Sequence, residues 1–177
     1  TLATLDERGA VRPRPGNLGP PVDPALTTRV VEWNDLEALE RELAAGDVAC
    51  VLAEPALTNV GIVLPEPGFH RGLRELTRRH GVLLILDETH TLSAGPGGAT
   101  RAWGLEPDIL TLGKPIAAGL SAAVYGFSAE VAERGGAAIR VDEADTGGIG
   151  GTLAGNALSL AAMRATLGEV LTPEAYE

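Results

Sequence analysis

Residues 81–114 read GVLLILDETHTLSAGPGGATRAWGLEPDILTLGK and contain two short apolar runs, 82–86 and 109–112. Each run has the length and composition of a strand buried in a parallel sheet. The first run ends at Asp87, and the second leads through a glycine to Lys114. Ligands of open α/β sheets bind beyond the carboxyl ends of the strands. The stretch therefore predicts a carboxylate and an amine at one edge of a sheet, facing the same site.

The remainder of the chain alternates between strand and helix patterns. Residues 1–27 are rich in proline and glycine and predict a loop-rich N-terminal part. From residue 28 to 177 we expect a core in which strands and helices follow one another, with strands at 28–32, 48–53 and 121–126 and helices at 36–45, 67–80, 128–134 and 157–171. This order predicts the α/β class, with a mainly parallel sheet and helices on both faces. No linker divides the chain, so we expect a single domain.

Composition narrows the possible partners. The chain has 177 residues and a net charge of −10, which argues against nucleic-acid and anionic-membrane binding. No apolar run approaches the roughly 20 residues of a membrane span, and no signal-peptide pattern opens the sequence. The single cysteine, Cys50, lies in an apolar run and is expected to be a small buried side chain. These features favour a cytoplasmic location.

Residue order and spacing in 81–114 point to a family. Asp87-Glu88-Thr89-His90-Thr91, then Pro107-Asp108, then Thr111-Leu112-Gly113-Lys114 resemble the core of class III (subgroup II) pyridoxal-phosphate-dependent aminotransferases. The resemblance implies the large domain of the pyridoxal-phosphate-dependent transferase fold type I.

Further segments resemble the glutamate-1-semialdehyde 2,1-aminomutase-like branch of that family. They are Glu54-Pro55, Asn59-Val60-Gly61, Pro65–Phe69 and Gly150–Asn156. A complete enzyme of this family is more than twice as long. We therefore expect a partial large domain, without the N-terminal phosphate loop and the C-terminal small domain.

The resemblance assigns the central roles to Lys114 and Asp87. Lys114 would form a Schiff base with pyridoxal 5'-phosphate and then shuttle a proton on the substrate. Asp87 would pair with the pyridine nitrogen of the cofactor and keep it protonated. Taken singly, a lysine is usually a solvated surface residue and a strand-end aspartate a turn residue or helix cap.

Four further residues are candidate cofactor contacts by resemblance. Thr89 would pack against the face of the ring, and His90 would lie near the 3-oxygen, with a purely structural histidine as an equal alternative. Asn59 would approach the 3-oxygen side, and Glu54 would hold the loop.

Thr152 precedes a predicted helix, whose free N–H groups favour phosphate. By resemblance it would reach the cofactor phosphate of the neighbouring subunit, so the active site would need a homodimer. The alternative is an ordinary turn at the start of a helix.

The function implied is amino-group transfer between an amino acid or amine and a keto acid or aldehyde. The loop 91–98 departs from the usual family pattern, and we therefore favour an aminotransferase, with a β- or ω-amino substrate as one option. A glutamate-1-semialdehyde 2,1-aminomutase is the first alternative, and a non-catalytic scaffold that kept the fold is the second. A nucleotide-binding domain is excluded because no glycine-rich phosphate motif follows a strand.

Overall fold

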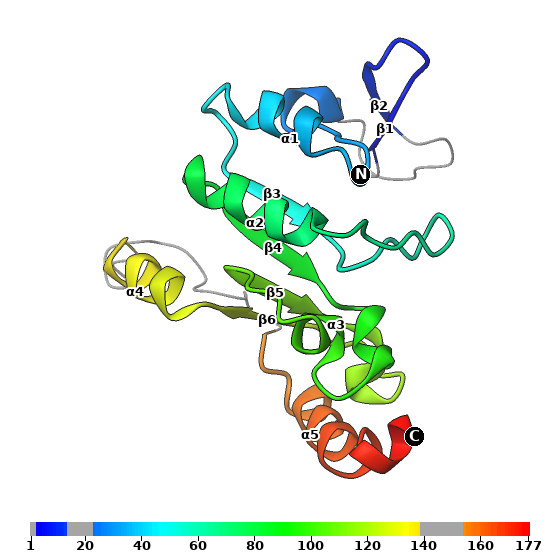
Figure 1. Ribbon diagram of the computed structural model, residues 1–177. Helices are drawn as coiled ribbons and strands as arrows, with labels where there is room; N and C mark the ends of the chain where they lie inside the picture. Colours follow the sequence, from blue (N-terminus) through cyan, green and yellow to red (C-terminus); the bar gives the residue numbers. More distant parts are fainter. Residues whose placement is uncertain (1–2, 14–22, 139–153) are drawn as a thin grey trace.

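The computed structural model describes residues 3–13, 23–138 and 154–177, and a four-stranded sheet forms its centre (Figure 1). The strand order is β3-β4-β5-β6, and the first three strands are parallel while β6 is antiparallel to β5. The bounds are Cys50–Ala53 for β3, Leu83–Asp87 for β4, Ile109–Leu112 for β5 and Val124–Phe127 for β6. The predicted α/β class with a mainly parallel sheet is confirmed.

Helices α1 (Leu36–Leu43) and α2 (Phe69–Arg79) enclose the core with one face of this sheet. Side chains of β4 alternate, so Leu84 and Leu86 point into the core and are 2% and 1% exposed. They pack in a cluster of buried side chains whose other members are Leu39, Leu43, Phe69, Leu73, Leu76 and Val82. Burial of each large aliphatic side chain stabilises the fold by about 1.5–3 kcal/mol.

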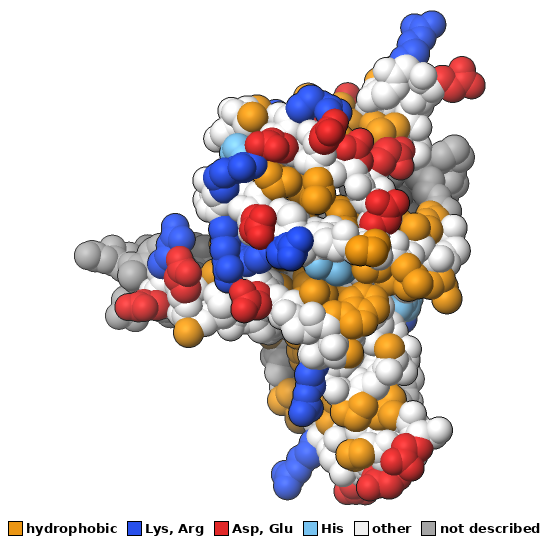
Figure 2. Space-filling view, in the orientation of Figure 1, with side chains coloured by type: hydrophobic (Ala, Val, Ile, Leu, Met, Phe, Trp, Pro, Cys, Tyr) orange, Lys and Arg blue, Asp and Glu red, His pale blue; other side chains and the backbone are white. Residues whose placement is uncertain are grey.

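Charged side chains of both signs lie over the α1 and α2 part of the molecule (Figure 2). Two ion pairs tie the helices to their surroundings: Arg79 with Glu40 across the two helices, and Arg78 with Glu106. Their side chains are more than half exposed, so each pair contributes at most about 1 kcal/mol.

The opposite face of the sheet is apolar and partly open within the described residues. The register places Leu52, Ile85, Ile109 and Phe127 in one row across the four strands. Leu52 at the edge is 68% exposed. Cys50 opens the same edge strand and is exposed, so the prediction of a buried cysteine is wrong: an edge strand has only one neighbour to cover it.

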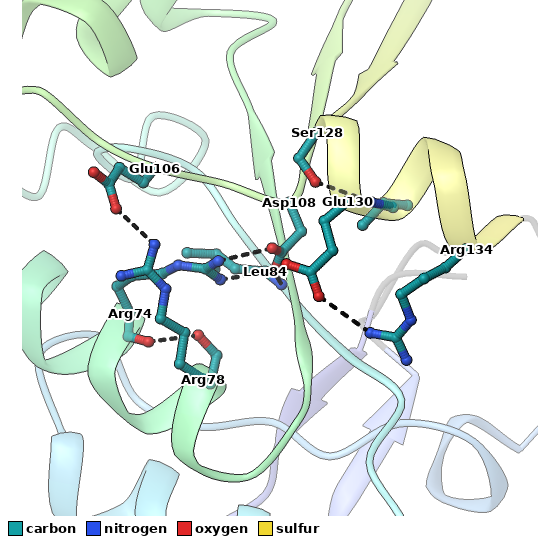
Figure 3. A network of polar contacts seen from close by, with 10 residues as sticks. Arg74, Arg78, Leu84, Glu106, Asp108, Ser128, Glu130 and Arg134 are labelled. Atoms are coloured by element: carbon teal, nitrogen blue, oxygen red, sulfur yellow. Dashed lines mark hydrogen bonds and ion pairs between the residues drawn. The ribbon is translucent and has the colours of Figure 1, made fainter.

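Asp108 joins α2, β4 and the start of β5 (Figure 3). Its carboxylate accepts hydrogen bonds from both terminal nitrogens of Arg74 and from the Leu84 backbone N–H, all at 2.7 Å. The backbone carbonyl of Asp108 accepts from the N–H of Ser128 at 2.8 Å. Burial alone would raise the pKa of Asp108, but the hydrogen bonds from Arg74 and Leu84 outweigh it and lower that pKa. The network fixes the strand that leads to Lys114.

The described chain contains further strands and helices outside this core. The N-terminal part, predicted as loop, contains an antiparallel hairpin of β1 (Ala3–Leu5) and β2 (Val11–Pro13). The strand predicted at 28–32 is wrong, since that segment pairs with no strand in the part of the chain that the structure describes. The remaining α-helices are α3 (Gly98–Ala102), α4 (Ala129–Ala138) and α5 (Ala157–Ala165). Among the described helices, none has the length and apolar character needed to cross a membrane.

Candidate active site

Lys114 lies at the carboxyl edge of the sheet, immediately beyond β5. It begins a 3₁₀ turn (Lys114–Ala117) in a left-handed backbone conformation, with φ of 46°. Such a conformation costs a non-glycine residue about 1–3 kcal/mol and is enriched at functional sites. The side chain is exposed and lines an open pocket together with Gly119–Ala123. The predicted amine therefore faces accessible space.

A chain of hydrogen-bonded side chains leads from Lys114 to the exit loop of β3. The Lys114 Nζ contacts Nε2 of His90, and the other ring nitrogen, Nδ1, contacts the Thr58 hydroxyl. That hydroxyl in turn donates to Glu54 Oε2, which lies 3.6 Å from His90 Nδ1. The side chains of His90 and Glu54 are 29% and 19% exposed. The structure therefore brings together three predicted site residues and adds Thr58, which the sequence analysis missed.

Asp87 closes β4 and pairs in register with Thr111 of the neighbouring strand. It is partly buried, and its Oδ1 accepts the backbone N–H of Thr89 at 2.9 Å. The Thr89 side chain lies against Gly113, where an added Cβ would sit 3.5 Å from Thr89 Oγ1. Because β4 and β5 are adjacent and parallel, Asp87, Thr89 and Lys114 share one edge of the sheet.

Glu88 has a structural role that its motif did not reveal. It is 1% exposed, and its carboxylate accepts hydrogen bonds from the Thr91 hydroxyl and from the backbone N–H groups of Ala99 and Thr100. Gly98 passes so close that an added Cβ would lie 2.5 Å from Glu88 Oε2. The unusual loop after Asp87 is thus folded around a buried carboxylate, which also caps α3.

The structure does not bring two of the predicted cofactor contacts, Asn59 and Thr152, together with the other site residues. Asn59 is exposed in the turn directly after Thr58. Thr152 lies outside the described residues, which resume at residue 154. The start of α5 packs beside the Lys114 pocket, because the Ser159 hydroxyl donates to the Ser121 carbonyl at 3.1 Å. A second pocket between these segments is also lined by Ser121–Ala123.

A family model, Aminotransferase class-III, matches residues 23–177. The chain belongs to the class-III aminotransferase family. It is 41% identical over 166 residues to a glutamate-1-semialdehyde 2,1-aminomutase 2 of Brevibacillus brevis, and 43% identical over 169 residues to a glutamate-1-semialdehyde 2,1-aminomutase of Roseiflexus castenholzii. These matches cover 92% and 90% of this chain but only 37% and 38% of the relatives. The predicted family and its aminomutase-like branch are confirmed.

Solved structures of class-III relatives agree with the fold. A glutamate-1-semialdehyde aminomutase from Pseudomonas aeruginosa superposes with a TM-score of 0.90 at 57% identity, over 97% of this chain and 39% of that one. A lysine-to-alanine variant of that enzyme was solved in complex with PMP. A β-phenylalanine aminotransferase from Variovorax paradoxus matches with a TM-score of 0.74 at 31% identity, over 92% of this chain and 36% of that one. The chain thus spans less than two fifths of the length of these relatives.

Proposed function

We propose that the full-length protein containing this chain is a pyridoxal-phosphate-dependent enzyme that moves an amino group, with Lys114 as the attachment residue. The observation that carries the proposal is the Lys114 amine, which is exposed to an open pocket and contacts His90 at the carboxyl edge of the sheet. A carboxylate, Asp87, ends the adjacent strand. The PMP complex of the Pseudomonas aeruginosa relative supports the same cofactor type.

The residues present suit this cofactor chemically. The group supplies an aldehyde and an electron sink when it is bound. Lys114 offers the amine that would hold it, and Asp87 offers the carboxylate that would pair with a protonated ring nitrogen. Thr89 and Asn59 would contact the ring. In this proposal the protein is a homodimer, and Thr152 of one subunit contacts the cofactor phosphate of the other.

Two substrate classes follow from different observations. The aminomutase reaction on glutamate semialdehyde comes first, because the relatives with 39–43% identity carry that name. Transfer between two molecules, an amino acid or amine and a keto acid or aldehyde, is the second candidate. It is favoured by the loop 91–98, which departs from the usual family pattern and is organised here by Glu88.

The first test is an absorbance spectrum of the full-length protein with added pyridoxal 5'-phosphate, before and after borohydride. We expect an absorbance band near the visible edge that borohydride abolishes. The reduced cofactor should then be found covalently bound to Lys114. Lys114→Ala should lack it, and Lys114→Arg is the matched variant that keeps a positive charge without a usable amine. If the parent protein shows no such band, the scaffold alternative replaces this proposal.

The second test separates the substrate classes. The purified holoenzyme is given glutamate semialdehyde alone, and separately a panel of α-, β- and ω-amino donors with a keto acid. Conversion of glutamate semialdehyde without a second substrate supports the aminomutase. Turnover that requires both a donor and an acceptor supports the aminotransferase.

A further inference from the structure

The side chains of Glu54, Thr58 and His90 form a continuous hydrogen-bonded path that ends at Lys114. The path crosses from the exit loop of β3, past the loop after β4, to the residue that follows β5. Thr58 is its central link, because it contacts both the carboxylate and the imidazole. None of these contacts is needed to build the sheet, whose strands are held by their own backbone ladders.

The donor count gives this path a direction. An ionised carboxylate can only accept, so the single hydroxyl hydrogen of Thr58 goes to Glu54. Towards His90 the Thr58 oxygen must then accept, which places the proton of the neutral imidazole on Nδ1. Nε2 is left with a free electron pair, and this pair faces the Nζ of Lys114. Two residues that do not touch Lys114 therefore help to set the tautomer of His90.

We propose that His90 is the proton acceptor that makes the Lys114 amine nucleophilic, and that Thr58 and Glu54 are positioning residues for it. An N–H bond of the Lys114 ammonium breaks, its electron pair stays on Nζ, and the proton forms a new bond to Nε2 of His90. The resulting imidazolium keeps its Nδ1–H on Thr58 and has the Glu54 carboxylate 3.6 Å away. An amine attacks a carbonyl only in its neutral form, so this transfer precedes attachment.

The inference rests on the proposed function, since it assigns how that function's attachment residue is activated. The ionisable groups that contact His90 in the described part of the chain are Glu54 at Nδ1 and Lys114 at Nε2. His90 therefore bridges the carboxylate side chain and the amine, with one of them at each ring nitrogen.

The first readout is the tautomer itself. Full-length cofactor-free protein is labelled with ¹⁵N-histidine, and the His90 signals are assigned with His90→Gln. We expect a neutral ring protonated on Nδ1 in the parent protein. Thr58→Val, which keeps the shape but removes the hydroxyl, should lower the fraction of His90 rings protonated on Nδ1, whereas Thr58→Ser should keep the parent pattern. The signals of His80 serve as the internal control for an intact fold.

The second readout is the rate at which pyridoxal 5'-phosphate attaches covalently to Lys114. At neutral pH we expect His90→Gln to slow attachment about 10²-fold, the lower range for a lost general base. Thr58→Val should slow it about tenfold, as expected for one hydrogen bond to a charged group, and Thr58→Ser should restore it. At strongly alkaline pH, where a free amine forms unaided, these differences should shrink.

The two readouts separate this inference from the proposed function. If the parent protein binds the cofactor on Lys114 but Thr58→Val changes neither the tautomer nor the attachment rate, the inference is wrong while the function stands. If the parent protein never attaches the cofactor, the proposed function fails, and the tautomer measurement still decides whether Thr58 directs His90. A tautomer change with an unaltered attachment rate would overturn the role of His90 as proton acceptor.

Discussion

Replacing Asp108 by asparagine tests how much the polar network under β5 contributes to stability. The variant keeps the shape of the side chain but loses its charge, and its NH₂ group then faces a donor where the carboxylate accepted. Three hydrogen bonds at 2.7 Å reach the carboxylate, two from Arg74 and one from Leu84. The side chains of Arg74 and Asp108 are only 16% and 12% exposed, so water compensates little. Breaking a buried pair on one side typically costs about 3–5 kcal/mol, and we expect about 3 kcal/mol here because both groups keep some exposure.

The assay is urea unfolding of the full-length protein, followed by circular dichroism. The urea concentration at the midpoint of unfolding should fall. The slope of the unfolding free energy against urea concentration should change little, since the variant alters stability rather than the surface exposed on unfolding. Glu106→Gln is the matched control. Glu106 lies two residues before Asp108 and pairs with Arg78, but the Arg78 and Glu106 side chains are 58% and 67% exposed. It should cost less than about 1 kcal/mol. Equal effects of the two substitutions would refute the argument that burial makes Asp108 important.

The stability lost in Asp108→Asn should also depend on pH. The pKa of Asp108 is lowered in the folded protein, so its contribution is fully present above the unfolded aspartate pKa of about 3.9. It is lost as the pH falls through the lower folded pKa. The stability difference between the parent protein and Asp108→Asn should therefore be constant near neutrality and shrink on acidification below about pH 4. A difference that persisted at the acid end would mean that the charge of Asp108 is not its source.

Three further substitutions and one control substitution test other parts of the fold. Gly98 has a left-handed backbone, with φ of 64°, and Gly98→Ala would also clash with buried Glu88, so it should lower the free energy of unfolding by about 2–4 kcal/mol. Gly46→Ala is the control: Gly46 has φ of 74° but open space around it, and the loss should be only about 1–2 kcal/mol. Equal losses for the two variants would contradict the clash with Glu88. Leu73→Ala removes a core side chain that is 2% exposed and should cost about 2–5 kcal/mol in the same urea assay. Burial lowers the pKa of His70, so the parent protein should lose stability as the pH falls below about 6.5. His70→Gln should abolish this loss. Identical pH profiles of stability for the two proteins would argue against a role of His70.

Local sequence patterns were sufficient for most of the architecture and for the family. The apolar runs at 82–86 and 109–112 predicted β4 and β5 because a buried parallel strand needs a continuous apolar segment. The strand predicted at 28–32 failed for a physical reason. Its β-branched residues have strand propensity, but Arg29 binds the Glu42 carbonyl and the Asp47 carboxylate beside α1, and no described strand pairs with the segment.

The sequence by itself was sufficient to identify the family and to predict that the Lys114 amine and the Asp87 carboxylate lie at one edge of the sheet. Both depend on residue type, order and spacing along two adjacent strands. Only the tertiary structure decided that Thr58 meets His90 and that His90 meets Lys114. These pairs are 32 and 24 residues apart, and their contact depends on the path of loops that carry no periodic signal. The burial of Glu88 and the exposure of Cys50 were likewise decided by the neighbours that the fold places beside each residue.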